Sequence, residues 1–223
     1  LKGDISIGHV RYSASGENFA ANAQPLLVKY KNGNIAVAHN GNLINAGIVR
    51  EHLEDQGMIF ATTTDSEVIA SLIARNYKVG VEDAILNMMG VIKGSYALVI
   101  MTNDKLIGVR DNYGLRPLVI GRRGNGYVLA SETCALDTIG AAFVRDVEPG
   151  EIVVIGEDGI RSIHCSSIIP QSKCIFEYIY FARPDSIMDG ISVNQARENA
   201  GMILAKEQPA EADVVICVPD SGT

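Results

Sequence analysis

The 223-residue sequence predicts an α+β fold, in which strands and helices gather in separate stretches of the chain. Apolar runs on both sides of Lys31–Asn34 predict an early hairpin, because Asn-Gly is a strong hairpin signal. Apolar residues at helical spacing then dominate residues 45–91. From Ser95 onward, short apolar runs separated by Gly-containing turns predict strands. These patterns predict the fold class but not the order of the layers.

The early hairpin is expected to pair Leu26–Tyr30 with Ile35–Ala38. Asn45 is expected to cap a helix that runs to about Gln56, because its side chain can accept a hydrogen bond from a first-turn N–H group. A second helix begins at Thr64–Glu67, where Thr and Glu have capping-box spacing. The residues of these two helices that are expected to face the core are Ile48, Val49, Leu53, Val68, Ile69, Leu72 and Ile73.

A third helix is expected over Val81–Val91, before the second group of strands. These strands are expected over Tyr96–Met101, Leu106–Arg110, Leu118–Gly121, Tyr127–Ser131 and Ile152–Ile155. An extended aromatic run over Ile175–Phe181 leads to a helix over 193–206, and the apolar run Asp213–Val218 predicts the first strand of a parallel sheet. We place a domain boundary in the polar stretch that precedes the aromatic run, which gives domains 1–168 and 169–223.

The composition excludes several classes of protein. With 26 acidic and 19 basic residues, the formal charge is −7, and no basic stripe is present to displace counterions from nucleic acid. No apolar run approaches the roughly 18–20 residues that cross a bilayer, and no signal-peptide pattern is visible. The spacing of the four cysteines indicates thiols rather than a disulfide framework. We therefore expect a cytoplasmic protein that binds neither nucleic acid nor membrane.

Three polar groupings can carry chemistry, and each also has an ordinary structural explanation. Arg11 can hold a carboxylate in two parallel hydrogen bonds, or it can form a surface ion pair. Asn40 and Gly41 can stabilise an oxyanion, or they can form an Asn-Gly turn after a strand. Asp65 can bind an ammonium group, or it can cap the second helix. Taken one by one, the residues leave both interpretations open.

In order and spacing, these groupings resemble a known family. Gly8–Tyr12, Ala38–Leu43 and Thr63–Glu67 resemble the glutaminase domain of class II glutamine amidotransferases, which are N-terminal-nucleophile hydrolases. Four later runs narrow the resemblance to the amidophosphoribosyltransferase branch of that family. They are Arg110–Leu118, Ala130–Asp137, Arg145–Gly150 and Phe176–Ser186. The resemblance covers essentially the whole chain.

The resemblance implies an αββα four-layer sandwich, incomplete at its N-terminal side, followed by the start of an α/β phosphoribosyltransferase domain. It implies that ammonia from glutamine displaces pyrophosphate from phosphoribosyl pyrophosphate and gives 5-phosphoribosylamine, the first step of purine biosynthesis. Arg11 would hold the α-carboxylate of glutamine and Asp65 its α-ammonium group, while Asn40 and Gly41 would form the oxyanion hole. Because dimers and tetramers occur in the family, a homo-oligomer is expected.

Two departures from the family pattern concern the glutamine site. Members carry an N-terminal cysteine, whose own α-amino group is the base, several dozen residues before the arginine motif; this sequence starts seven residues before Gly8. Internal cysteines have no free α-amino group, so we expect the 223 residues by themselves to be inactive. Ala14 stands where Thr is usual, which removes a hydroxyl from the expected pocket. Asn112 stands where Pro is usual and is expected to affect only a turn.

The resemblance also implies two metal sites. Ser221 would lie near the magnesium ion that accompanies the pyrophosphate substrate, and a plain turn at the end of a strand is the alternative. Cys174 matches the first ligand of a [4Fe–4S] cluster in one branch of the family, and a buried apolar cysteine is the alternative. Mg²⁺ and, where Cys174 is a ligand, the iron–sulfur cluster are therefore the expected cofactors.

Two other functions are open at this point. An aminosugar synthase or an asparagine synthetase, also class II amidotransferases, would share the first three motifs but not Arg110–Leu118 or Phe176–Ser186. A non-catalytic glutamine-sensing module would use Arg11 and Asp65 for binding alone. The glutaminase interpretation requires four residues, which we call the glutamine-site residues, to converge on one cleft. They are Arg11, Asn40, Gly41 and Asp65.

Overall fold

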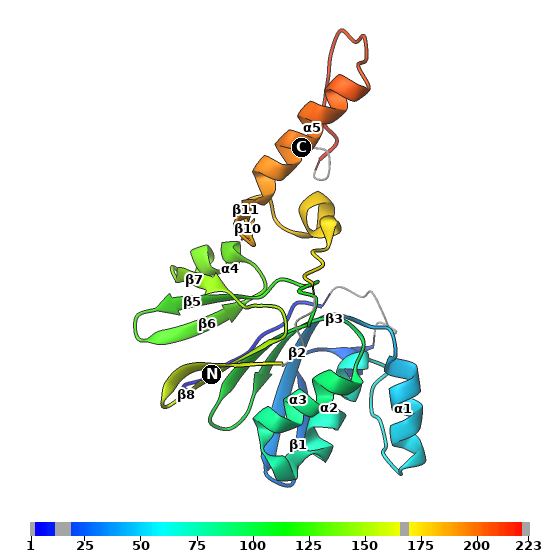
Figure 1. Cartoon of the computed structure of the whole chain (residues 1–223), viewed down its shortest axis with the longest axis vertical. Helices are drawn as coiled ribbons and strands as arrows, with labels where there is room; N and C mark the ends of the chain where they lie inside the picture. The colour runs from blue at the N-terminus through cyan, green and yellow to red at the C-terminus, as the bar shows by residue number, and fades with distance from the viewer. Residues whose placement is uncertain (1–2, 12–18, 166–169, 220–223) are drawn as a thin grey trace.

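A computed structural model describes residues 3–11, 19–165 and 170–219 (Figure 1). The helices are α1 (Ala46–Asp55), α2 (Asp65–Arg75), α3 (Val81–Val91), α4 (Thr133–Thr138) and α5 (Val193–Glu207). The strands are β1 (Leu26–Tyr30), β2 (Gly33–Leu43), β3 (Gly94–Met101), β4 (Leu106–Arg110), β5 (Val119–Arg123), β6 (Gly126–Ala130), β7 (Ala142–Asp146), β8 (Glu151–Gly156), β9 (Gly159–His164), β10 (Ile187–Met188) and β11 (Ile191–Ser192). The short helical turns are η1 (Ala20–Asn22), η2 (Tyr77–Val79) and η3 (Glu177–Phe181).

The described residues up to 165 stack in four layers. Six antiparallel strands form one sheet in the order β1-β2-β3-β4-β8-β9, and three strands form a second sheet in the order β6-β5-β7. Helices α1, α2 and α3 lie on the outer face of the first sheet, while α4 lies on the outer face of the second (Figure 1). The αββα sandwich implied by the resemblance is therefore confirmed.

Side-chain alternation along the strands builds a separate apolar layer at each interface. On β3, Leu98 packs toward the helices and Ala97 packs toward the second sheet. On β5, Ile120 packs between the sheets and Val119 packs toward α4. Because successive side chains of a strand point to opposite faces, these central strands are apolar on both faces. They read as continuous apolar runs, which is why the sequence pattern did not give the layer order.

Several predicted elements are confirmed, and α1 begins after Asn45 as predicted, but the expected side-chain cap is absent. The helix over Val81–Val91 has the predicted ends. Asn45 makes no side-chain cap on α1; instead, its side chain bridges to the end of α3, donating to the Val91 carbonyl and accepting from the Lys93 N–H. Ile48 was expected in the core, yet it is 74% exposed, because α1 lies against α2 and buries Val49 and Leu53 instead.

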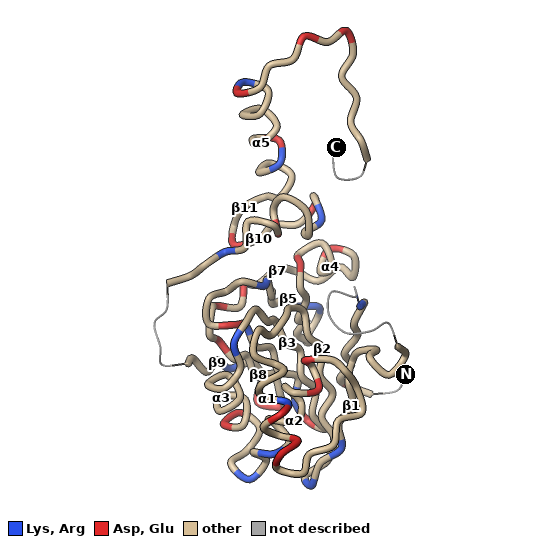
Figure 2. The backbone as a smooth tube through the Cα atoms, turned by 90° about the vertical axis from the view of Figure 1, so that its right-hand side faces the viewer, with Lys and Arg blue, Asp and Glu red and all other residues tan. Residues whose placement is uncertain are grey.

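Residues 170–219 form an arm that extends away from the sandwich (Figures 1 and 2). This C-terminal arm, residues 170–219, departs from two predictions. The run over Ile175–Phe181 is helical rather than extended. No strand forms over Asp213–Val218, because no described strand lies beside it, and Val215 is 90% exposed. The division of the chain at residue 168 stays a prediction.

None of the described helices combines the length and apolarity that a membrane span requires.

Glu151, at the start of β8, provides a test of the ion pairs in the sandwich. Its fully buried carboxylate accepts hydrogen bonds from Arg145 at 2.8 and 2.6 Å, and also from Ser162 Oγ and the Glu148 N–H. Burial raises the pKa of Glu151, but these donors outweigh burial and hold the pKa below its ordinary value. Glu151→Gln should lower the free energy of unfolding by about 2 kcal/mol at pH 7.

The effect of this variant should depend on pH. Because the folded-state pKa of Glu151 is depressed, its stabilisation is complete above the ordinary pKa of about 4.3 and is lost as pH falls through the folded-state value. The difference in unfolding free energy between wild type and variant, measured in urea, should therefore shrink between pH 7 and about pH 3. Asp185→Asn removes an exposed pair with Arg183 and should change nothing. A difference that stays constant with pH would contradict this prediction.

Candidate active site

The expected oxyanion residues lie inside β2 rather than in a turn after it. Asn40 pairs with Ala97 and Gly41 with Tyr96 on β3, so the Asn-Gly turn considered from sequence is wrong. Gly41 has a φ of 146°, and a Cβ at this position would collide with the main-chain carbonyl of Ser95. Glycine therefore allows β2 to continue past this point in contact with β3.

Asp65 lies in the first turn of α2 and contacts the same part of β2. Its Oδ2 accepts a hydrogen bond from the Leu43 N–H at 3.0 Å, and its Oδ1 lies 3.6 Å from His39 Nδ1. Burial raises the pKa of Asp65, but the contact with His39 and the main-chain donors outweigh burial and lower it overall. Asp65 therefore places a negative charge beside the residues that follow His39.

The loop before α2 is held by Glu67. Its buried carboxylate accepts hydrogen bonds from the N–H groups of Ala61 and Thr62 at 2.8 and 2.7 Å, and from Thr62 Oγ1 at 2.7 Å. The predicted capping box with Thr64 does not form, since the Thr64 side chain makes no cap. Arg50 of α1 donates to the carbonyl groups of Thr62 and Thr64. These contacts position the first turn of α2.

His39 connects the segments of the site, although the sequence analysis did not single it out. Its side chain is 1% exposed, and its Nδ1 lies 3.3 Å from Ser66 Oγ as well as near Asp65. Its carbonyl lies 3.1 Å from His9 Nε2, and its N–H donates to Gln24 Oε1 at 2.7 Å. The signal that identifies it is its position directly before the Asn-Gly pair, at the end of an apolar run.

Arg11 follows His9 in an extended segment. Ile5, Ile7, His9 and Arg11 are half-buried and alternate with exposed residues, which is the pattern of a chain lying along a surface. Burial lowers the pKa of His9, and the nearby charge of Arg11 lowers it further. Through the bond of His9 to the His39 carbonyl, the segment that carries Arg11 contacts β2 at the residue whose side chain faces Asp65 and Ser66. Convergence of the four glutamine-site residues on one ligand-sized cleft stays a prediction.

The remaining predicted site residues receive less support from the structure. Ala14 and Ser221 lie outside the described residues. Cys174 is half-buried before η3, and Asn112 lies in a turn as expected. Among residues 3–11, 19–165 and 170–219, no group of three or more His, Cys, Asp or Glu side chains is arranged to hold a metal ion. A [4Fe–4S] cluster takes four thiolates, so these residues alone do not complete one.

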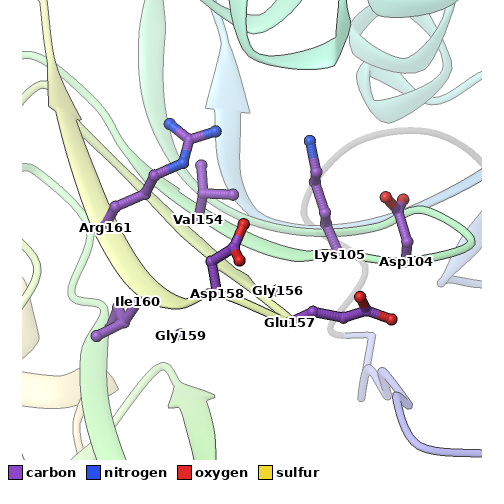
Figure 3. A pocket seen from close by; sticks show the side chains of 9 residues that line it. All are labelled: Asp104, Lys105, Val154, Gly156, Glu157, Asp158, Gly159, Ile160 and Arg161. Atoms are coloured by element: carbon purple, nitrogen blue, oxygen red, sulfur yellow. The ribbon is translucent and has the colours of Figure 1, made fainter.

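A surface pocket lies away from this site, between the turns that join β3 to β4 and β8 to β9 (Figure 3). Its two cationic lining residues, Lys105 and Arg161, both donate to Glu82 Oε1, at 2.8 and 2.5 Å. Asp104 and Asp158 add negative charge to the lining. Because both cations already pair with the Glu82 carboxylate, this pocket is a poor candidate for binding an amino-acid carboxylate.

Gly41→Ala tests the close approach of β2 and β3. The added Cβ would meet the main chain of Ser95 and Tyr96, so the free energy of unfolding should fall by about 2 kcal/mol or more. The control is Gly126→Ala on β6, where the nearest atom, the Arg123 carbonyl oxygen, lies 3.7 Å from the added Cβ. Its effect should stay within about 0.5 kcal/mol. Equal losses in urea denaturation of the two variants would show that the contact at Gly41 is unimportant.

Known proteins match this chain in both sequence and fold. A family model described as a glutamine amidotransferase domain matches residues 9–138. An amidophosphoribosyltransferase of Bacillus subtilis (strain 168) is 50% identical over 223 residues, which are 100% of this chain and 47% of the relative. The chain thus spans about half the length of this relative.

Two solved structures match the fold over 96% of this chain and 46% of their own length, each at 50% identity. One, with a TM-score of 0.92, is an allosteric regulatory enzyme of purine biosynthesis. The other, with a TM-score of 0.90, is a glutamine phosphoribosylpyrophosphate amidotransferase from B. subtilis complexed with ADP and GMP. Since the family model covers more than half of the residues, the chain belongs to the glutamine amidotransferase domain family.

Proposed function

We propose that the protein containing this chain is an amidophosphoribosyltransferase that obtains its ammonia from glutamine. The observation that carries the proposal is the attachment of the anionic Asp65 to the stretch of β2 that holds Asn40 and Gly41. The 50% identity to a relative with this name, over the whole chain, supports the same activity. It favours this reaction over that of another class II amidotransferase.

Recognition of free glutamine needs one fixed cation and one fixed anion, because the α-carboxylate and the α-ammonium group are both charged. Arg11 is the proposed partner of the carboxylate, and Asp65 is the proposed partner of the ammonium group. The Leu43 N–H, the Ser66 N–H and the His39 side chain take three acceptor positions on the Asp65 carboxylate. An ionised carboxylate has about four such positions, so capacity for an ammonium group remains.

Attack on the glutamine carboxamide forms a tetrahedral intermediate with a negative oxygen. The Asn40 side-chain amide and the Gly41 main chain are the proposed groups that stabilise this oxygen. Because β2 is paired with β3 at both positions, the main chain there is already fixed before the substrate arrives. Donors that need no reorganisation lower the barrier most. No residue of this chain is assigned as nucleophile or base.

In the second half of the proposed reaction, ammonia displaces pyrophosphate from phosphoribosyl pyrophosphate and gives 5-phosphoribosylamine for purine biosynthesis. The names of the matched structures support these substrates and this pathway. A magnesium ion near Ser221, a [4Fe–4S] cluster at Cys174, a cytoplasmic location and a homo-oligomer belong to the same proposal. The described residues do not complete either metal site, so no step is assigned to a metal.

Asp65→Asn in the full-length protein tests the glutamine site. The variant should raise the KM for glutamine by about 10- to 100-fold, because a charged hydrogen bond to the ammonium group is lost. Phosphoribosylamine formation from added ammonium chloride should stay within about twofold, since free ammonia needs no contact with Asp65. Both rates are measured with the same assay for phosphoribosylamine.

Asp104→Asn, in the exposed turn between β3 and β4, is the matched control and should change neither rate. An equal loss with glutamine and with ammonia as nitrogen source would indicate general damage and would remove Asp65 from the site. Wild-type protein that forms phosphoribosylamine from ammonia but never from glutamine would support a glutamine-sensing module instead. Wild-type protein that forms none from either source would overturn the proposed activity.

A further inference from the structure

Arg110, at the end of β4, is buried in the sandwich but contacts the C-terminal arm. Its guanidinium donates to the carbonyl groups of Arg116, Val147 and Gly114 at 2.8, 2.8 and 3.0 Å. It also faces Asp189 of the arm, with Nη1 to Oδ1 at 3.3 Å and Nη2 to Oδ2 at 3.4 Å. The Arg110 side chain is 3% exposed, so its charge requires a partner. Asp189 supplies that partner from outside the sandwich.

Asp189 occupies an unusual main-chain conformation. It lies in the turn between β10 and β11 and has a φ of 47°, the only positive φ of a non-glycine residue in the described part of the chain. Aspartate tolerates this conformation better than most residues, yet it still costs energy. Lys173 Nζ lies 3.7 Å from its Oδ2. The turn therefore retains a strained residue at the point where its carboxylate meets Arg110.

Two more charged residues of the sandwich, Arg116 and Glu132, contact the arm. Arg116 Nη1 donates to the buried Glu177 Oε1 at 2.6 Å, and the Arg116 guanidinium lies 5.1 Å from the centre of the Phe181 ring. Glu132, which precedes α4, accepts hydrogen bonds from the Arg183 N–H at 2.8 Å and from Ser186 Oγ at 2.7 Å. We call the five charged residues Arg110, Arg116, Glu132, Glu177 and Asp189 the polar clamp.

The clamp attaches the arm by directional contacts. The apolar cluster of the arm, formed by Ala182, Met188 and Val193 with Tyr178 against it, packs within the arm itself. Charged hydrogen bonds, unlike apolar surfaces, hold only within narrow limits of distance and angle. The clamp therefore defines one position of the arm relative to the sandwich.

A short series of contacts joins the clamp to the glutamine site. Gly41 pairs with Tyr96 on β3. The Tyr96 N–H donates to Asp111 Oδ2, and the Asp111 N–H donates to the Tyr96 carbonyl at 2.9 Å. Asp111 is the neighbour of Arg110 in the chain, and Arg110 meets Asp189. The expected oxyanion residue and the arm are therefore connected through one strand and one buried turn.

We propose that the Arg110–Asp189 pair couples glutamine hydrolysis to amination. By holding the C-terminal arm in a fixed position relative to the glutamine site, the pair allows ammonia released there to be used for amination. This inference rests on the proposed function. Arg110 and Asp189 are positioning residues, since neither is assigned a contact with substrate. Loss of the pair should waste ammonia without stopping either half-reaction.

The experiment is Asp189→Asn in the full-length protein. Asparagine keeps the shape of the side chain and tolerates positive φ, so the variant removes the charge with little change in the turn. Three rates are measured: glutamate formed from glutamine, phosphoribosylamine formed from ammonium chloride, and phosphoribosylamine formed from glutamine. The first two should stay within about twofold, while phosphoribosylamine formed per glutamate should fall by about tenfold. Amide hydrogen exchange over residues 177–193 should become faster.

Glu151→Gln is the matched control, because it breaks a buried pair that lies wholly within the sandwich. It should lower stability and leave the yield of phosphoribosylamine per glutamate unchanged. An unchanged yield in Asp189→Asn, with or without faster exchange, would overturn the inference. So would an equal fall of all three rates, which a purely structural role would produce. If the wild-type protein makes no phosphoribosylamine from glutamine, the proposed function itself fails, and the coupling inference fails with it.

Discussion

The antiparallel pairing of β2 with β3 is the contact on which the rest of the structure depends. At one end of this ladder, Val37 lies opposite Ile100, and both side chains enter the core beneath the helices. Further along the same ladder, Asn40 and Gly41 lie opposite the buried residues Ala97 and Tyr96. One ladder therefore fixes both the apolar packing and the position of the polar residues. This arrangement explains why position 41 requires glycine, since a Cβ there would collide with the main chain of β3.

Local patterns predicted the parts of the fold whose causes are local. The helix over Val81–Val91 and the strand over Leu106–Arg110 have the expected ends, because periodicity and nearby turns decide them. The Asn40–Gly41 pair was ambiguous for a different reason. Within a few residues it has the composition of a turn, and only its pairing with residues 96–97, more than fifty positions away, keeps it in a strand. A single sequence does not show that partner.

Because distant contact partners are not visible in a single sequence, the predictions for residues 175–181 of the arm and for the Asn45 cap of α1 were also wrong. The aromatic run Ile175–Phe181 has the composition of a strand, yet it is helical, and Arg197 of α5 donates to the Tyr178 and Ala182 carbonyl groups at its end. The Asn45 side chain makes hydrogen bonds at the C-terminal end of α3 rather than at the start of its own helix, α1. The candidate site was found because its residues lie in compact motifs. His39 was missed because its importance comes from contacts with three separate segments.

Some buried carboxylates in this fold, such as Glu151, accept hydrogen bonds from an arginine, whereas Asp111 accepts them from main-chain N–H groups. This difference decides which arginines remain for other partners. Asp111 is fully buried, yet main-chain N–H groups of Tyr96, Tyr113, Leu115 and Arg116 donate to it. Such donors occupy the acceptor positions of the carboxylate without a cation. The adjacent Arg110 is therefore not needed by its own neighbour, and its charge can meet Asp189. Because main-chain N–H groups satisfy the Asp111 carboxylate, the guanidinium of Arg110 is left to contact the arm.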